Sequence, residues 1–240
     1  LGQEVQNYDG TMTKYLPQPN NFLDAFQTGF GSNTNVAMDA GTDRSTFRFY
    51  YNHNDSRGIY FNNNLNKNAF DLRVTHKITD FIDIDISTSY TNLNGKNPPR
   101  LGGLDAFGSL DLGHMYTWVI PRNYDTKYWM QKANYTSIFG GAPDPSASDE
   151  PNKAPETRFW YTLYNDNYTQ NEQLLRSRVA INIKLTSWAK PLLEGNINNI
   201  YRKSEVKELG QQRNYAGGLY GQGFNTKESQ FMKWMVMMNK

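Results

Sequence analysis

Strict alternation of apolar and polar residues is the feature that most limits how this chain can fold. Ile82, Ile84, Ile86 and Tyr90 alternate with aspartate and serine residues. A period of two residues places the apolar side chains of a β-strand on one face and the polar side chains on the other. The segment therefore predicts a strand with one apolar face, and not a helix.

Six further segments show the same alternation. They predict strands around residues 34–38, 45–53, 66–77, 178–185, 193–201 and 230–239. In the last of these, Phe231, Met235 and Met237 make the second face apolar too, so the pattern leaves its facing open. The sequence thus predicts an all-β chain of seven antiparallel strands.

The connections between these strands alternate between short and long. Residues 41–43, 79–80 and 186–188 make short turns, whereas residues 54–65, 93–172 and 203–227 make long connections. Several strands also exceed the five or six residues that are usual in soluble sheets. Outer-membrane β-barrels combine short periplasmic turns, long extracellular loops and strands of about 9–11 residues. We therefore expect part of a large antiparallel transmembrane β-barrel.

Because unpaired backbone groups are not tolerated in hydrocarbon, strands span a membrane only as a closed barrel. The outward face of such a barrel, which contacts lipid, must then be apolar. Phe81 and Trp188 lie at tight turns, where aromatic rings anchor at the membrane–water interface. The strands of a soluble β-sandwich with one solvent-exposed face would show the same alternation of apolar and polar residues. The alternating loop lengths are what favour a membrane barrel over a sandwich. The residues predicted to face lipid are Phe47, Phe49, Leu72, Val74, Ile82, Ile84, Ile86, Val179, Ile181 and Ile183.

The same pattern suggests how the chain is divided. Residues 1–32 are expected to form an extracellular loop with a short helix over residues 22–28, and residues 33–240 a partial barrel. The long extracellular loops are expected at 93–172 and 203–227, with a helix over residues 104–119 in the first. Because seven strands are too few for a membrane barrel, we expect the sequence to be a piece of a longer protein.

The composition and a search for known motifs exclude several classes of function. The chain has no cysteine, 20% charged residues and a net charge of +2, which argue against disulfide scaffolds and nucleic-acid binding. With a mean hydropathy of -0.76 and no long apolar run, a membrane-spanning helix is excluded. No nucleophile elbow, zinc helix or phosphate-binding loop is present. We expect no catalytic residues, no metal site and no cofactor.

Aromatic residues are concentrated in the longest loop. Aromatic faces suit stacking on sugar rings or anchoring a protein partner. The alternative is that most of them pack the loop onto itself, which a loop of this length needs in order to be ordered. The residues predicted to contact a ligand or partner are Trp118, Tyr124, Tyr128, Trp129 and Trp160.

Several segments resemble the SusC/RagA-like TonB-dependent outer-membrane transporters. Among them are Pro17-Gln-Pro-Asn-Asn21, Lys96-Asn-Pro-Pro-Arg100 and Pro121-Arg-Asn-Tyr-Asp-Thr-Lys-Tyr-Trp129. The others lie at residues 8–10, 26–29, 45–49, 69–81, 195–199, 207–210 and 216–218, in the order of the family.

This resemblance implies a nutrient importer of the outer membrane of a Gram-negative bacterium. Such transporters have a plug inside a barrel of about 22 strands. A SusD-like surface lipoprotein caps the barrel, TonB acts through the plug, and the substrates are oligosaccharides or peptides. The sequence shows no counterpart of the plug or of the TonB-contacting segment. The alternatives are a soluble carbohydrate-binding β-sandwich and, without an identifiable acid–base pair, a hydrolase of β architecture.

Overall fold

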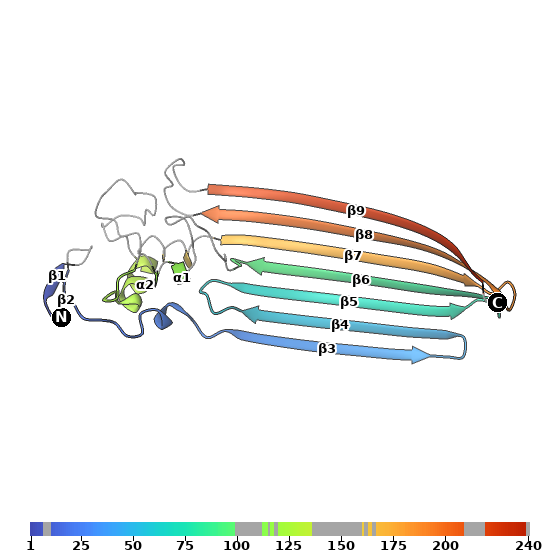
Figure 1. Ribbon diagram of the computed structural model, residues 1–240, viewed down its shortest axis with the longest axis horizontal. Helices are drawn as coiled ribbons and strands as arrows, with labels where there is room; N and C mark the ends of the chain where they lie inside the picture. Colours follow the sequence, from blue (N-terminus) through green and yellow to red (C-terminus); the bar gives the residue numbers. More distant parts are fainter. Residues whose placement is uncertain are drawn as a thin grey trace.

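The computed structural model describes residues 1–6, 11–98, 112–114, 116–117, 120–135, 160, 163–164, 167–208 and 219–238. Its main feature is one antiparallel sheet, whose seven strands neighbour each other in sequence order. They form a long, gently curved wall (Figure 1). The strands are β3 (Phe30–Gly41), β4 (Ser45–Arg57), β5 (Asn64–Lys77), β6 (Ile82–Lys96), β7 (Asn167–Ile183), β8 (Ala189–Glu208) and β9 (Leu219–Met238).

The predicted all-β class and the seven strands are therefore confirmed, but the sheet is not closed. Within the part of the chain that the structure describes, the outer edges of β3 and β9 have no partner strand. An open, curved arc of consecutive antiparallel strands is the shape expected of one section of a barrel wall.

The remaining elements gather at one end of the sheet (Figure 1). A small hairpin pairs β1 (Glu4–Gln6) with β2 (Met12–Lys14), and η1 (Leu23–Ala25) is a single 3₁₀ turn where a helix over residues 22–28 was predicted. The loop after β6 contains α1 (Leu112–His114) and α2 (Thr126–Tyr135). Most of the helix predicted over residues 104–119 falls outside the described residues.

Helix α2 was not predicted, although its start has a local signal. The backbone N–H of Tyr128 donates to Oδ1 of Asp125 at 3.1 Å, so Asp125 caps the first turn. None of the described helices has the length and the apolar character needed to cross a membrane.

The pairing of the strands fixes which side chains share a face. Phe47, Val74, Ile86 and Val179 are direct cross-strand partners, in this order, from β4 to β7. Every residue that was predicted to face lipid lies on this same side, which we call the apolar face. On β9, Trp234 pairs with Leu193 and so joins the apolar face, which resolves the facing that its sequence left open.

Most strands run further than their apolar pattern predicted. Strands β4 and β5 extend to Arg57 and Asn64, which shortens the predicted 54–65 connection to residues 58–63. Strands β8 and β9 likewise extend through most of the predicted 203–227 loop. The extensions are rich in polar residues on both faces and are held by side-chain pairs such as Asn171 Nδ2 to Asn92 Oδ1 at 2.9 Å. Alternation of apolar and polar residues in the sequence therefore predicts only the part of a strand that has one apolar face.

Three tight turns lie together at the end of the sheet opposite the loops (Figure 1). Each begins with a threonine, and its hydroxyl oxygen accepts the backbone N–H three residues later. The distances are 3.1 Å from Ser45 to Thr42, 3.0 Å from Ile82 to Thr79 and 3.0 Å from Ala189 to Thr186. The threonine hydroxyl thus replaces a backbone carbonyl, which lets the chain reverse within two residues.

This turn device predicts the effect of an isosteric substitution. Thr79→Val removes the hydroxyl that accepts from Phe81 and Ile82. We expect it to lower the free energy of unfolding by about 1 kcal/mol, as measured by denaturant titration. In the control variant Thr91→Val, a threonine within β6 is changed, and we expect a smaller effect. Equal losses in the two variants would contradict this role of the hydroxyl.

Candidate functional site

The apolar face of the sheet is not covered by a second layer among the described residues. Its large side chains are half-buried or exposed, and on the edge strand Met232 and Trp234 keep 79% and 80% of their surface. Side chains such as Ile82, Ile84, Val179 and Ile181 therefore do not belong to a packed protein core. A contiguous uncovered apolar surface of this size is rare on soluble monomers and marks a site of contact with another protein, a ligand or a membrane.

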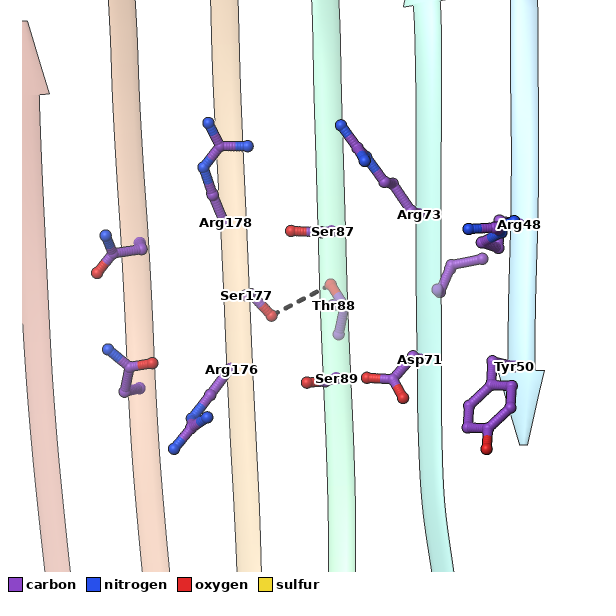
Figure 2. Close-up of a pocket in the computed structure, with 13 residues that line it drawn as sticks. Arg48, Tyr50, Asp71, Arg73, Ser87, Thr88, Ser89, Arg176, Ser177 and Arg178 are labelled. Carbon is purple, nitrogen blue, oxygen red and sulfur yellow. Dashed lines mark hydrogen bonds between the residues drawn. The ribbon is translucent and has the colours of Figure 1, made fainter. Parts of the chain in front are cut away.

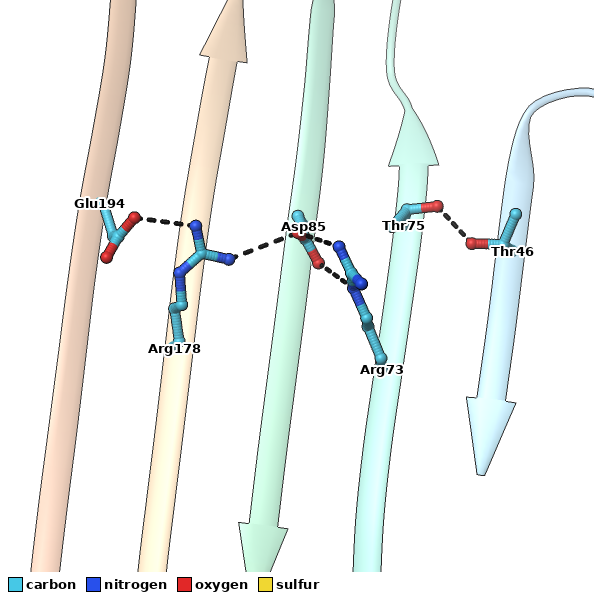
Figure 3. A network of polar contacts seen from close by, with 6 residues as sticks. All are labelled: Thr46, Arg73, Thr75, Asp85, Arg178 and Glu194. Carbon is cyan, nitrogen blue, oxygen red and sulfur yellow. Dashed lines mark hydrogen bonds and ion pairs between the residues drawn. The ribbon is translucent and has the colours of Figure 1, made fainter. Parts of the chain in front are cut away.

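The opposite side, which we call the polar face, contains a row of alternating charges across four strands. The guanidinium of Arg73 binds Asp85 through two hydrogen bonds, Nε to Oδ1 at 3.1 Å and Nη2 to Oδ2 at 2.9 Å. Arg178 binds Asp85 Oδ2 at 3.3 Å and Glu194 Oε2 at 2.8 Å. We call Arg73, Asp85, Arg178 and Glu194 the charge ladder (Figure 3).

The ladder continues beyond these four residues. The hydroxyls of Thr46 and Thr75 are hydrogen-bonded across β4 and β5 (Figure 3). On β9, Lys233 is the cross-strand partner of Glu194. Opposite charges therefore face one another along the width of the sheet, which favours this register over its neighbours.

Beside the charge ladder the polar face has a hollow of about 490 Å³. It spans five strands, and most of its lining residues form two rows of cross-strand partners, with Leu72, Thr88 and Ser177 in the row between them (Figure 2). On its floor are the small side chains of Ser87 and Ser89 from β6. One row is Arg48, Arg73, Ser87, Arg178 and Asn196, and the other is Tyr50, Asp71, Ser89, Arg176 and Asn198.

Several polar groups of the hollow have no partner in the described part of the chain. Arg48 is paired with Asp39 at 2.6 Å, and Arg73 and Arg178 are paired in the charge ladder. Asp71 and Arg176 form no ion pair or hydrogen bond with a described residue, and neither do the hydroxyls of Ser87 and Ser89. The hollow thus offers donors and charges to a ligand.

At the loop end of the sheet a second group of residues forms a compact core, which we call the loop cluster. Segments far apart in the sequence meet there, from η1, the long loop and α2. Its buried residues are Ala25, Leu112, Ile120, Tyr124, Trp129, Met130, Trp160 and Leu163.

Asparagine side chains tie this loop cluster to the strands. Asn62 Nδ2 donates to the carbonyls of Leu163 at 3.3 Å and Tyr164 at 3.2 Å. Asn97 Oδ1 accepts the backbone N–H of Tyr168 at 2.6 Å. Asn62 and Asn97 have positive φ angles of 57° and 45°, a conformation that asparagine tolerates better than most residues. These bonds hold the loops in one arrangement above the sheet.

The aromatic residues predicted to contact a ligand are not placed alike. Trp160 is fully buried and donates from Nε1 to the hydroxyl of Tyr124 at 2.9 Å, while Trp129 stacks on Tyr124. As the chain stands, these three side chains have almost no surface for a ligand and pack the loop onto itself. Tyr128 keeps 36% of its surface, and its contact with a ligand stays a prediction. Trp118 lies outside the described residues.

Burial also affects the tyrosines around the loop cluster. It raises the pKa of Tyr164 to about 12, and it raises the pKa of Tyr116 well above the ordinary value. Tyr116 and Thr126 are hydrogen-bonded through their hydroxyls at 2.5 Å. Both tyrosines are therefore neutral at physiological pH and serve packing. In the described residues no three histidine, aspartate or glutamate side chains converge on a point suited to a metal ion.

No protein family matches the sequence, and no curated protein matches it either. A solved structure does match the fold: the RagAB peptide importer in the "closed-closed" state. The similarity has a TM-score of 0.63 at 11% sequence identity and covers 98% of this chain. At that identity the likeness shows the fold alone, and the chain spans 24% of the length of the matched chain.

The charge ladder predicts unequal effects for two neighbouring aspartates. Asp85→Asn removes the carboxylate that Arg73 and Arg178 share. We expect it to lower the free energy of unfolding by about 1–2 kcal/mol. Among the described residues Asp83 has one ion-pair partner, Lys184 at 3.9 Å, so Asp83→Asn should change stability by less than about 0.5 kcal/mol. Thermal unfolding of both variants measures the difference, and equal melting temperatures would contradict the assigned role of Asp85.

Proposed function

We propose that this chain forms part of the barrel wall of a SusC/RagA-like TonB-dependent importer in the outer membrane of a Gram-negative bacterium. The importer takes up oligosaccharides or peptides together with a SusD-like surface lipoprotein. The proposal assigns transport, and not catalysis, to the chain. The observation that carries it is a sharp polarity boundary on the apolar face.

This boundary separates two adjacent rows of cross-strand partners. The row on the turn side is Val36, Tyr51, Phe70, Tyr90 and Leu175 from β3 to β7. The row two residues nearer the loops is Thr34, His53, Asn68, Asn92 and Gln173. Between these two rows the side chains thus change from apolar and aromatic to polar, as expected at the edge of a lipid layer.

Aromatic rings mark this edge. Tyr51 stacks on Phe70 with ring centroids 4.7 Å apart, and Phe70 stacks on Tyr90 at 6.5 Å. Membrane barrels have aromatic girdles where the apolar band meets the headgroups. At the turn end, Phe81 and Trp188 are more than half exposed and can occupy the opposite interface.

The height of the apolar band supports the same interpretation. On β6 it runs from Ile82 to Tyr90, about 26 Å along the strand at the usual rise per residue. The apolar band of outer-membrane barrels is about 25 Å tall. Within the band, the hydroxyls of Thr88 and Ser177 lie 3.2 Å apart and satisfy one another, as groups facing hydrocarbon must.

The boundary changes on the last two strands. In the boundary row, β8 and β9 present Asn199 and Glu228. On the turn side of this row the first apolar residues on this face are Ile197 and Met232, whereas Tyr201 and Phe224 lie on the same face nearer the loops. On these two strands the apolar band therefore begins nearer the turns, and aromatic residues recur on its loop side.

If the apolar face meets lipid, the polar face lines the interior. The charge ladder and the hollow then face a water-filled passage, where charged groups are tolerated. The loop cluster would lie outside the membrane, and exposed apolar residues in the segments that surround it suit contact with a lipoprotein partner. These residues are Tyr15, Leu16, Phe22, Leu23 and Tyr128. The likeness in fold to the RagAB peptide importer supports this assignment.

An arginine scan of two adjacent residues tests the facing. Ile181 lies on the apolar face and Asn182 on the polar face, beside Asp83. We expect Ile181→Arg to cost about 2–4 kcal/mol of stability in a bilayer, because the charge would face lipid. Asn182→Arg, the matched control, should be close to neutral. Folding titrations in lipid vesicles measure both, and equal tolerance would count against a lipid-facing Ile181.

Single cysteines test the location, because the chain has none of its own. Ser89→Cys and Tyr128→Cys should react in whole cells or opened outer membranes with a water-soluble maleimide, whereas Ile84→Cys should not react until detergent is added. Rapid labelling of all three in a protein that purifies without detergent would instead favour the soluble β-sandwich. Loss of peptide or oligosaccharide uptake on deletion of the protein would then test transport itself.

A further inference from the structure

We propose that the hollow of the polar face binds a carboxylate group, seated above Ser87 and Ser89 between the guanidinium groups of Arg73, Arg176 and Arg178. The identity of the ligand as a transported solute rests on the proposed function. The binding itself rests on the side chains of the hollow and is independent of transport.

The floor of the hollow provides uncompensated donors. Ser87 and Ser89 lie two residues apart on β6, and both side chains extend into the hollow (Figure 2). Neither hydroxyl has a hydrogen-bond partner among the described residues. Their small size also leaves a trough between the longer side chains of β5 and β7. An anion in this trough would accept bonds from both hydroxyls.

The walls of the hollow are positively charged. Four arginines and one aspartate line it, namely Arg48, Arg73, Arg176, Arg178 and Asp71. Arg48 and Arg73 are direct cross-strand partners, and their mutual repulsion is offset by Asp39 and Asp85, which pair with them. The acids of the charge ladder neutralise this group from the turn side only, because Asp85 and Glu194 lie beyond Arg73 and Arg178.

The two arginines of the charge ladder have more N–H donors than their ion pairs use. Arg73 uses Nε and Nη2 for Asp85, and Arg178 uses Nη1 and Nη2 for its two acids. A guanidinium has five N–H bonds in a planar fork that matches a carboxylate. Both side chains can therefore keep their acids and still have further N–H groups to donate.

Arg176 and Asp71 determine which anion fits. Arg176 pairs with Ser89 across the strands and has no acid of its own among the described residues. Asp71 lies on the other side of Ser89 and is likewise unpaired. Arg176 is the one arginine of the hollow's lining with no acid among the described residues, so a singly charged carboxylate is enough to balance it, and Asp71 opposes the binding of further negative charge. The carboxylate of an acidic peptide or of a uronic acid has this chemistry.

The test is titration calorimetry of the full chain in detergent with paired probes. An end-blocked tri-glutamate peptide is compared with tri-glutamine, and tri-galacturonate with its methyl ester. We expect at least one acidic probe to bind about tenfold more tightly than its neutral partner, with the preference weakened by high salt. The arm that responds identifies the source of the carboxylate. Equal binding of acidic and neutral probes in both arms would overturn the proposal.

Two variants with opposite expected effects locate the site. Arg176→Gln should weaken binding of the acidic probe about tenfold, and Asp71→Asn should tighten it a few-fold by removing repulsion. Arg44→Gln, in the turn between β3 and β4, is the control and should leave binding unchanged. Because Asp71→Asn gains affinity, a misfolded variant cannot imitate it, and unchanged affinity in that variant would contradict the site. If the acidic probe still binds but the cysteine-labelling experiment shows no membrane location, the proposed importer function is wrong and the carboxylate site stands.

Discussion

The uncovered apolar face is the constraint on which the rest of this structure depends. On the turn side of the sheet, alternation places the large apolar residues of β3 to β7 on one side, and the register aligns these residues into a continuous surface. In water such a surface would be costly, because each exposed Å² of apolar area carries about 25 cal/mol. A lipid phase removes that cost and at the same time requires the backbone to be paired, which the long antiparallel ladder achieves between its edges.

The facing of the strands could be predicted from the sequence because it depends on local alternation alone. Ile82 to Tyr90 could hardly be arranged otherwise, and the partners of this segment follow from the same pattern. Strand ends could not be predicted where both faces are polar. In the asparagine-rich stretches, side-chain amides such as Asn52 and Asn171 pair across strands and extend the sheet, although composition there suggests loops.

The polar hollow was harder to foresee for a different reason. Alternation assigns Arg73, Asp85 and Arg178 to the polar face, but their contacts depend on the register between β6 and β7. Those strands are joined through residues 97–166, and nothing local fixes how they align. The burial of Trp129 and Trp160 likewise results from segments that meet only in the folded chain, so exposed and enclosed aromatic residues look alike in the sequence.

The three threonine turns bear on the order in which the sheet can assemble. Each joins two strands within a few residues, so that β3–β4, β5–β6 and β7–β8 are hairpins whose contacts are close in sequence. Joining β6 to β7 closes a loop of 70 residues, against six between β4 and β5, an extra entropic cost of about 2 kcal/mol. Local contacts form sooner than distant ones. The sheet thus contains three hairpins that can form locally, and the slow step in its assembly is the pairing of β6 with β7, which joins the second hairpin to the third.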